Sequence, residues 1–212
     1  MTTENTPQPI DRQSSIGIIG AGNIGRAIAE ALARNGIAAT LSNSRGPESL
    51  RELVAAIGPT IKAGTREEAA AKDIVFVAVN WSKLPVALSG LPDFEGRIVI
   101  DTNNPIEAPL FKPFDLGGRT SSQIVAGMVP GARLIKAFNH LSATLLSSDP
   151  AREGGKRVLF YAGDDAAAKA ELAALIGRLG FFGIDLGTLA VGAPLIEFPG
   201  GPLPALNLGK FD

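Results

Sequence analysis

Short apolar runs alternate along this chain with segments in which apolar residues return every three or four positions. A run of about four to eight apolar residues predicts a strand buried on both faces, and the wider spacing predicts a helix with one apolar face. Alternating strands and helices of this kind predict a doubly wound α/β fold, in which helices cover both sides of a mainly parallel sheet. The strand candidates are Ile16–Ile19, Ala38–Leu41, Thr60–Ala63, Ile74–Val79, Arg97–Asp101, Leu134–Phe138, Val158–Ala162 and Phe181–Leu186.

The expected helices carry signals at their ends. One has Pro47 in its first turn and stops at Gly58-Pro59. Thr65 and Glu68 form a capping-box pattern at the start of another. The helix that starts near Pro47 has an apolar face formed by Leu50, Leu53, Val54 and Ile57. A later helix has an apolar face formed by Leu172, Leu175, Ile176 and Leu179.

The pattern divides the chain into three parts. Residues 1–14 are polar and predict a flexible leader, residues 15–140 predict the main α/β domain, and residues 141–212 predict a small C-terminal part. The last stretch, Gly187–Asp212, is rich in Gly and Pro and shows little periodicity, yet it holds several large apolar side chains. A disordered tail seldom carries so many, so we expect an ordered tail that wraps the domain.

Composition narrows the function classes. Hydrophobic residues make up 45% of the 212 residues, and the formal charge of −1 lacks the basic excess of a nucleic-acid binder. The chain has no cysteine, which excludes disulfides and thiolate metal sites. No stretch approaches the roughly 18 apolar residues of a membrane span, and the polar first residues do not resemble a signal peptide. We therefore expect a cytoplasmic protein that binds neither nucleic acid nor membrane.

A glycine-rich turn follows the first expected strand. Gly20-x-Gly22-x-x-Gly25 stands between an apolar run and a helix, the context of a dinucleotide-binding Rossmann unit. Gly20 would allow the tight turn, Gly22 would let a pyrophosphate approach the backbone, and Gly25 would let the helix pack closely on the strand. The N–H groups at the helix start, from Asn23 and Ile24 onward, would then face the phosphates. A tight structural turn in another kind of α/β protein is the alternative.

The stretch after the second strand indicates which dinucleotide binds. Proteins that bind NAD place an Asp or Glu here for the ribose hydroxyls, whereas this chain has Asn43, Ser44 and Arg45. A carboxylate would repel a 2′-phosphate, while a guanidinium binds one bidentately. The cofactor is therefore predicted to be NADP(H). Alternatively, Arg45 is a solvated residue that opens the helix at Pro47.

Mostly polar or aromatic residues stand at or just after the ends of the fourth, fifth and sixth strands, at the sheet edge where ligands of such folds bind. They are Asn80, Trp81, Asn103, Asn104, Ala137, Asn139 and His140. We expect the first six at the cofactor, and His140 to donate a hydrogen bond to a hydride acceptor. The alternatives are turn bonding for Asn103 and Asn104, a place in the core for Trp81, and a helix-opening role for His140.

No metal site is expected. Asp164-Asp165 could suggest a pair of ligands, but acidic residues in the first turn of a helix usually interact with the helix dipole.

Four motifs together resemble a known family. Gly20–Gly25, Asn43–Ser49, Asp101–Pro105 and Lys136–Asn139 are similar, in order and spacing, to the coenzyme F420-dependent NADP oxidoreductases. The resemblance implies a Rossmann domain, a small C-terminal part, a homodimer, and hydride exchange between NADP(H) and a deazaflavin. It also implies cofactor contacts at Gly20, Gly22, Asn23, Ile24, Ser44 and Arg45.

One departure leaves the acceptor open. Where members of the family often have Pro before Trp, this chain has Val79-Asn80-Trp81 in a loop expected near the nicotinamide, so the resemblance does not fix the acceptor. We expect a small-molecule acceptor, either F420 or a flavin. We expect it under the tail segment Glu197–Leu203, which combines apolar surface with glycines. Two other functions remain open: an NADPH-dependent dehydrogenase or imine reductase of small substrates, and a non-enzymatic NADPH-binding sensor.

Overall fold

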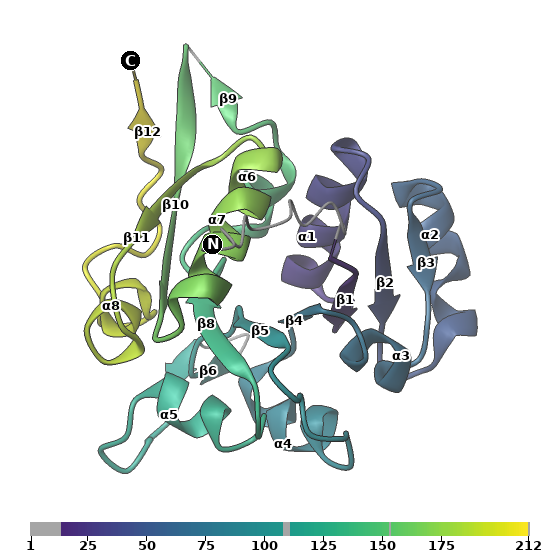
Figure 1. The fold of residues 1–212 in the computed structure, drawn as a ribbon, viewed down its shortest axis with the longest axis horizontal. Coiled ribbons are helices and arrows are strands. Elements are labelled where there is room, and N and C mark those ends of the chain that lie inside the picture. The colour runs from purple at the N-terminus through teal and green to yellow at the C-terminus, as the bar shows by residue number, and fades with distance from the viewer. Residues whose placement is uncertain (1–13, 108–110, 153, 212) are drawn as a thin grey trace, which may run out of the picture.

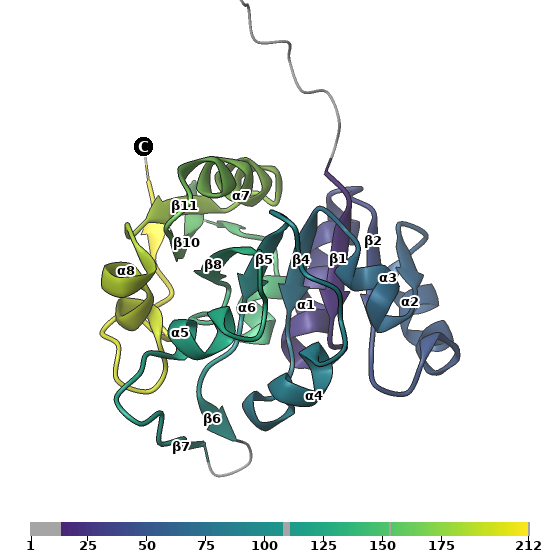
Figure 2. The same ribbon diagram turned by 60° about the horizontal axis from the view of Figure 1, so that its bottom comes forward.

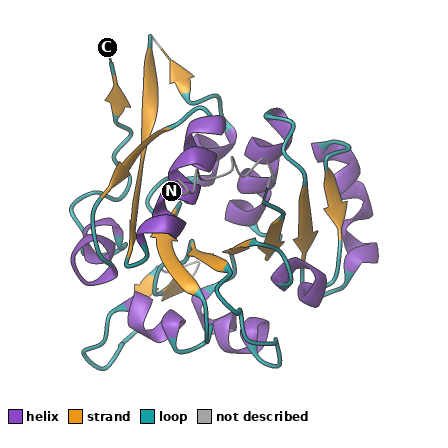
Figure 3. Ribbon diagram, viewed as in Figure 1, coloured by secondary structure: helices purple, strands orange, loops and turns teal. Residues whose placement is uncertain are grey.

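The computed structural model describes residues 14–107, 111–152 and 154–211. Within these ranges strands and helices alternate along the chain, as the sequence pattern predicts (Figures 1 and 3). The leader predicted over residues 1–14 lies outside the described residues except for Ser14. The strands are β1 (Ile16–Ile19), β2 (Ala39–Ser42), β3 (Ile61–Ala63), β4 (Ile74–Val77), β5 (Ile98–Asp101), β6 (Ile106–Glu107), β7 (Lys112–Pro113), β8 (Arg133–Ala137), β9 (Ala151–Arg152), β10 (Gly155–Gly163), β11 (Phe182–Asp185) and β12 (Gly209–Lys210).

Most of the helices are short, and several begin at the predicted signals. Thr65 and Glu68 form both bonds of a capping box at the start of α3, and α2 ends at Ile57, just before Gly58. None of the helices in the described ranges is both long enough and apolar enough to cross a bilayer. The helices are α1 (Asn23–Arg34), η1 (Pro47–Leu50), α2 (Arg51–Ile57), α3 (Arg66–Ala70), η2 (Trp81–Lys83), α4 (Leu84–Leu88), α5 (Ser121–Ala126), α6 (Ala143–Ser147), α7 (Ala166–Arg178) and α8 (Leu189–Ile196), where η marks a 3₁₀ helix.

One sheet organises the molecule. Its strand order is β11-β10-β8-β5-β4-β1-β2-β3, and β9 and β12 pair with β10. The six neighbours β8, β5, β4, β1, β2 and β3 run parallel, and β10 joins antiparallel to β8. β6 and β7 form a separate antiparallel pair. The chain order reverses between β1 and β4, which is the switch point where ligands of doubly wound sheets bind. The Rossmann-type, mainly parallel α/β fold predicted from the sequence is therefore confirmed.

Side chains alternate between the two faces of the sheet. On β4, Ile74 and Phe76 pack with α1, α2, α6 and α7, while Val75 and Val77 pack with α3, α4 and α5 (Figure 2). Two-sided burial explains why the central strands read as unbroken apolar runs. A smaller third cluster forms where Val158 and Phe160 of β10 meet Ile196 of α8.

The C-terminal part departs most from the sequence prediction. The stretch after Gly187 is ordered as expected, but its first eight residues beyond Thr188 form helix α8 despite Pro194 inside it. Its start is marked by the Thr188 side chain, which accepts a bond from the Val191 N–H, rather than by a long apolar period. The sequence pattern also missed α5, α6 and the two-residue strands, because such short elements have too few positions to show a period. Because β10 and β11 continue the main sheet, the division at residue 140 stays a prediction.

Candidate functional site

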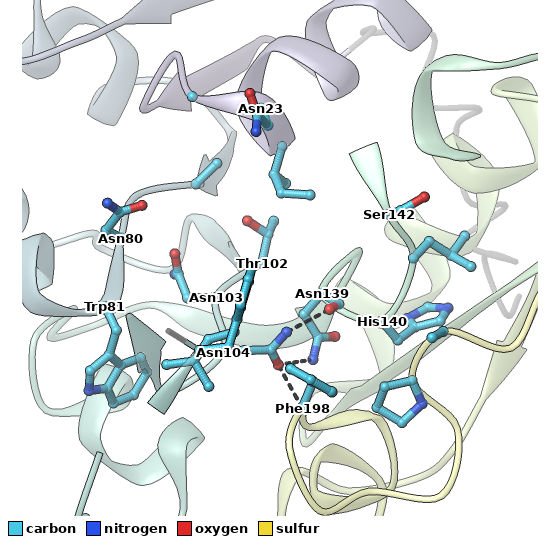
Figure 4. A pocket seen from close by; sticks show the side chains of 18 of the residues that line it. Asn23, Asn80, Trp81, Thr102, Asn103, Asn104, Asn139, His140, Ser142 and Phe198 are labelled. Atoms are coloured by element: carbon cyan, nitrogen blue, oxygen red, sulfur yellow. Dashed lines mark hydrogen bonds between the residues drawn. The ribbon is translucent and has the colours of Figure 1, made fainter. Parts of the chain in front are cut away.

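A cavity of about 700 Å³ opens at the carboxyl ends of β1, β4, β5 and β8 (Figure 4). It starts at the glycine turn, passes the loops that follow the central strands, and reaches the tail at Phe198 and Ala205. Nine of the predicted site residues line it: Gly22, Asn23, Ile24, Asn80, Trp81, Asn103, Asn104, Asn139 and His140. Other lining residues were not predicted from the sequence, among them Thr102, Ile106, Phe111, Leu141, Ser142, Leu145 and Pro204. Several of these adjoin predicted residues in the chain, which was the only available signal for them.

The glycine turn has the geometry that its spacing predicts. Gly20 has a φ of +111°, and a Cβ on Gly25 would lie 1.9 Å from the Gly20 carbonyl oxygen. The turn and the close helix packing are therefore confirmed. A Cβ on Gly22, in contrast, would meet no atom within 4 Å. That open space at the N-terminus of α1 fits a pyrophosphate close to the backbone.

The Asn43–Arg45 turn lies at the same sheet edge, beside the glycine turn. Ser42 pairs with Ile19 in the β1–β2 register, and its carbonyl accepts a bond from the Gly20 N–H. The Asn43 side chain accepts from the Arg45 N–H at 2.9 Å and so shapes the turn. Ser44 and Arg45 are exposed, and the Arg45 guanidinium contacts no partner among the described residues. An anion at this turn would therefore find a free cation, although these residues do not line the cavity itself.

The side chain of Asn103, in the loop after β5, forms hydrogen bonds to neighbouring parts of the protein. The Asn103 amide donates to the Val77 carbonyl and to Asp101 Oδ1, and accepts from the Val79 N–H. These bonds match the turn-bonding alternative for Asn103. Its contact with the cofactor stays a prediction.

Asn104 and Asn139 bond to each other and to the tail (Figure 4). Asn104 Nδ2 donates to the Asn139 carbonyl at 2.7 Å, and Asn104 Oδ1 accepts from the Phe198 N–H at 3.0 Å. Asn139 Nδ2 donates to the Ile196 carbonyl at 2.7 Å. Asn139 Oδ1 is buried and has no partner among the described residues, so it remains available to a ligand donor.

Buried His140 lines the cavity with a neutral ring. Its side chain is 3% exposed, and burial lowers the pKa of the imidazole from 6.5 to about 4. Nε2 accepts a bond from the Phe160 N–H at 3.3 Å, so the ring proton is assigned to Nδ1. Nδ1 is buried without a partner among the described residues. His140 thus bonds to backbone, though to a neighbouring strand rather than as a helix opener, and retains one unpaired donor.

Trp81 lines the cavity, and Phe138 supports the turn beside it in a strained backbone conformation. Trp81 is 7% exposed and belongs to the core cluster beneath α4 while also lining the cavity, so both of its expected roles are compatible with its position. Phe138, the residue before Asn139, has a φ of +62°, which is costly for an aromatic residue. Phe138 packs edge-on against Phe76, with ring centroids 5.3 Å apart. That packing holds the turn which presents Asn139 and His140. Ala137 is fully buried in β8 and does not line the cavity.

The acidic pair after β10 has structural bonds. Asp165 caps α7 by accepting from the Ala168 N–H at 2.7 Å, which is the main cause that lowers its pKa from 3.8. Asp164 accepts from the Leu189 N–H. Within the described part of the chain, no cluster of three His, Asp or Glu side chains could hold a metal ion.

Comparison with known proteins identifies relatives along most of the chain. The family described as "NADP oxidoreductase coenzyme F420-dependent" matches residues 15–105. The structure of a hypothetical protein, SMa0349 of Sinorhizobium meliloti, is 44% identical with a TM-score of 0.88, over 93% of this chain and 96% of that one. A candidate F420-dependent NADP-reductase of Arthrobacter sp. FB24 is 28% identical with a TM-score of 0.71, over 85% and 89%.

A curated relative is longer. Metalloreductase STEAP3 of Rattus norvegicus is 29% identical over 92% of this chain, which spans only 40% of that protein's length. The family match over residues 15–105 and the similarity to the Arthrobacter reductase agree with the glycine turn and the switch-point cavity, and the chain belongs to the family of coenzyme F420-dependent NADP oxidoreductases.

Proposed function

We propose that this protein transfers a hydride between NADP(H) and a deazaflavin (F420) or flavin-like acceptor. The observation that carries the proposal is the continuous cavity, which begins at the glycine turn and ends against the tail. Its volume of about 700 Å³ lies well within the range of ligand sites and leaves room for a second ring beside a nicotinamide. Trp81, Phe111 and Phe198 supply aromatic walls for such a ring.

The chain's own residues would hold and orient the two reactants. The first N–H groups of α1, at Asn23 and Ile24, lack partners within the helix and would bind the pyrophosphate at Gly22. Ser44 and Arg45 would bind the 2′-phosphate. Bound NADP(H) supplies the hydride, so the protein needs few ionisable groups beyond those that position the reactants and exclude water. His140, neutral at physiological pH, would present its Nδ1 proton to the acceptor.

We expect Arg45→Ala to weaken NADPH binding about 10- to 100-fold and to leave NADH binding nearly unchanged. The reason is that a charge-assisted bond to the 2′-phosphate is worth about 1.5–3 kcal/mol, and NADH lacks that phosphate. Fluorescence titration with both cofactors measures the effect. Arg51→Ala is the matched control, because Arg51 is also exposed but pairs with Glu48 on the adjoining helix. Equal losses for the two cofactors would remove the 2′-phosphate assignment.

The acceptor assay tests the proposed reaction itself. We expect stopped-flow oxidation of NADPH to be rapid with F420, FMN or riboflavin and to be absent with ketones or imines. Turnover of ketones or imines alone would assign the dehydrogenase function instead. Tight NADPH binding without turnover of any acceptor would assign the sensor function.

The homodimer and the cytoplasmic location remain proposals. Exposed apolar side chains on α8 and in the residues after it provide surface for a second copy. They are Val191, Leu195, Leu206, Leu208 and Phe211.

A further inference from the structure

A buried ion pair lies beneath the cavity, and the proposed reaction does not use it. Lys136 of β8 and Asp101 of β5 are register partners in adjacent strands, and both are completely buried. Lys136 Nζ lies 2.8 Å from Asp101 Oδ2. The other carboxylate oxygen, Oδ1, accepts from the Asn103 N–H at 2.9 Å. Buried ion pairs add little stability compared with apolar residues of the same size, so stability alone does not explain this one.

What the lysine adds is three donors, which reach three different elements. Besides Asp101, Lys136 Nζ donates to the Asn103 carbonyl in the loop after β5 and to Ser121 Oγ at the start of α5. The Ser121 hydroxyl in turn donates to Glu197 Oε2, just past the end of α8. We call Asp101, Lys136, Ser121 and Glu197 the latch; the first three are buried and Glu197 is half-buried. The latch connects the strand ends under the cavity to the tail.

The latch ends at Glu197, between two residues that Asn104 and Asn139 also bind. Ile196 accepts from Asn139, and Phe198 donates to Asn104. Glu197 between them is held through Ser121. Three consecutive residues are therefore held by side chains from the loop after β5, the loop after β8 and the start of α5. The third of them, Phe198, is 40% exposed and forms a wall of the cavity.

We propose that Lys136, acting through Ser121 and Glu197, is a positioning residue that holds Phe198 and the following chain against the acceptor end of the cavity. This inference rests on the proposed function for the identity of the acceptor. The glycine turn and Arg45, which would bind the phosphates of NADPH, belong to other elements, so we expect release of Glu197 from Ser121 to leave NADPH binding nearly unchanged. Acceptor binding depends on the latch, because Phe198, which forms a wall of the cavity, moves when Glu197 is released from Ser121.

Two neighbouring serines provide a matched test. Ser121 and Ser122 are both buried, but the Ser122 hydroxyl has no partner among the described residues, whereas Ser121 joins Lys136 to Glu197. In Ser121→Ala we expect the amide hydrogens of Phe198 and Ala205 to exchange at least about 10-fold faster than in the wild type. Ser122→Ala should leave them within about 2-fold. The factor of 10 corresponds to the loss of one charge-assisted hydrogen bond.

Kinetics separate positioning from a general loss of structure. Ser121→Ala and Glu197→Gln should raise the KM for the acceptor about 5- to 10-fold, with kcat less affected and the NADPH Kd unchanged. Ser121→Thr, which keeps the hydroxyl, should restore the wild-type KM. Equal amide exchange in the two alanine variants, or an equal rise of KM and NADPH Kd, would overturn the proposal. Amide exchange needs no acceptor, so failure of the proposed reaction in the wild type would be recognised separately.

Discussion

Gly25→Ala should destabilise the protein by at least about 3 kcal/mol and abolish NADPH binding. The new methyl group would lie 1.9 Å from the carbonyl oxygen and 3.0 Å from the carbonyl carbon of Gly20, and these backbone atoms belong to the tight turn itself. Relief requires α1 to move away from β1, which opens both the core and the phosphate site. For a chain of this size the loss corresponds to a fall in Tm of about 6–12 °C.

Gly22→Ala is the matched control three residues earlier. A Cβ there meets no atom of the protein within 4 Å, and the φ of −77° suits any residue. We expect wild-type Tm but weakened NADPH binding, because the methyl group would occupy the space proposed for the pyrophosphate. Thermal unfolding and fluorescence titration distinguish the two variants. A Gly25→Ala protein of wild-type stability would contradict the close packing of helix and strand.

His140 should make the protein lose stability as the pH falls below 6.5. The pKa of its imidazole is about 4 in the folded state and 6.5 in the unfolded state, so between these values the unfolded chain binds a proton that the folded chain does not. The free energy of unfolding should therefore fall with decreasing pH, by about 2 kcal/mol at pH 5 and about 3 kcal/mol once the pH reaches 4. Urea denaturation at pH 7, 6 and 5 measures this slope.

His140→Gln supplies the control, since glutamine can accept the Phe160 N–H but does not titrate. We expect the slope between pH 5 and 6.5 to flatten in this variant, whatever its absolute stability. The pKa values of Glu67 and Asp165 are also lowered, chiefly by backbone hydrogen bonds, but from 4.5 and 3.8, so their contributions are lost only at more acidic pH. An unchanged slope in His140→Gln would show that the imidazole stays solvated.

The elements that could be predicted from the sequence are those marked by residues close together in the chain. All eight strand candidates are present, because a strand buried on both faces shows its apolar run directly. The first candidate has the ends of β1, β10 begins three residues before its candidate, and the other ends differ by at most two residues. The capping box at Thr65 acts within three residues and was equally visible. Helix α8 was not predicted, because eight residues with an internal proline give no clear period.

For the candidate site, the sequence predicts where residues lie but not which hydrogen bonds they form. Nine predicted residues line one cavity, since the carboxyl ends of parallel strands meet at one edge of the sheet. Their hydrogen-bonding state could not be predicted. The amides of Asn104 and Asn139 are held by each other and by the tail at residues 196–198, more than fifty positions further along the chain.

By itself the sequence determined the doubly wound fold, the glycine turn and the absence of a carboxylate at Asn43–Arg45, because each is written within a few neighbouring residues. Only the tertiary structure decided which polar groups are free. It joins Lys136 to Asp101 across 35 positions and Ser121 to Glu197 across 76, and it buries His140 so that its ring stays neutral. Those properties depend on which strands are neighbours and on how much water reaches a side chain, and both are set by the packing of the whole chain rather than by any local stretch.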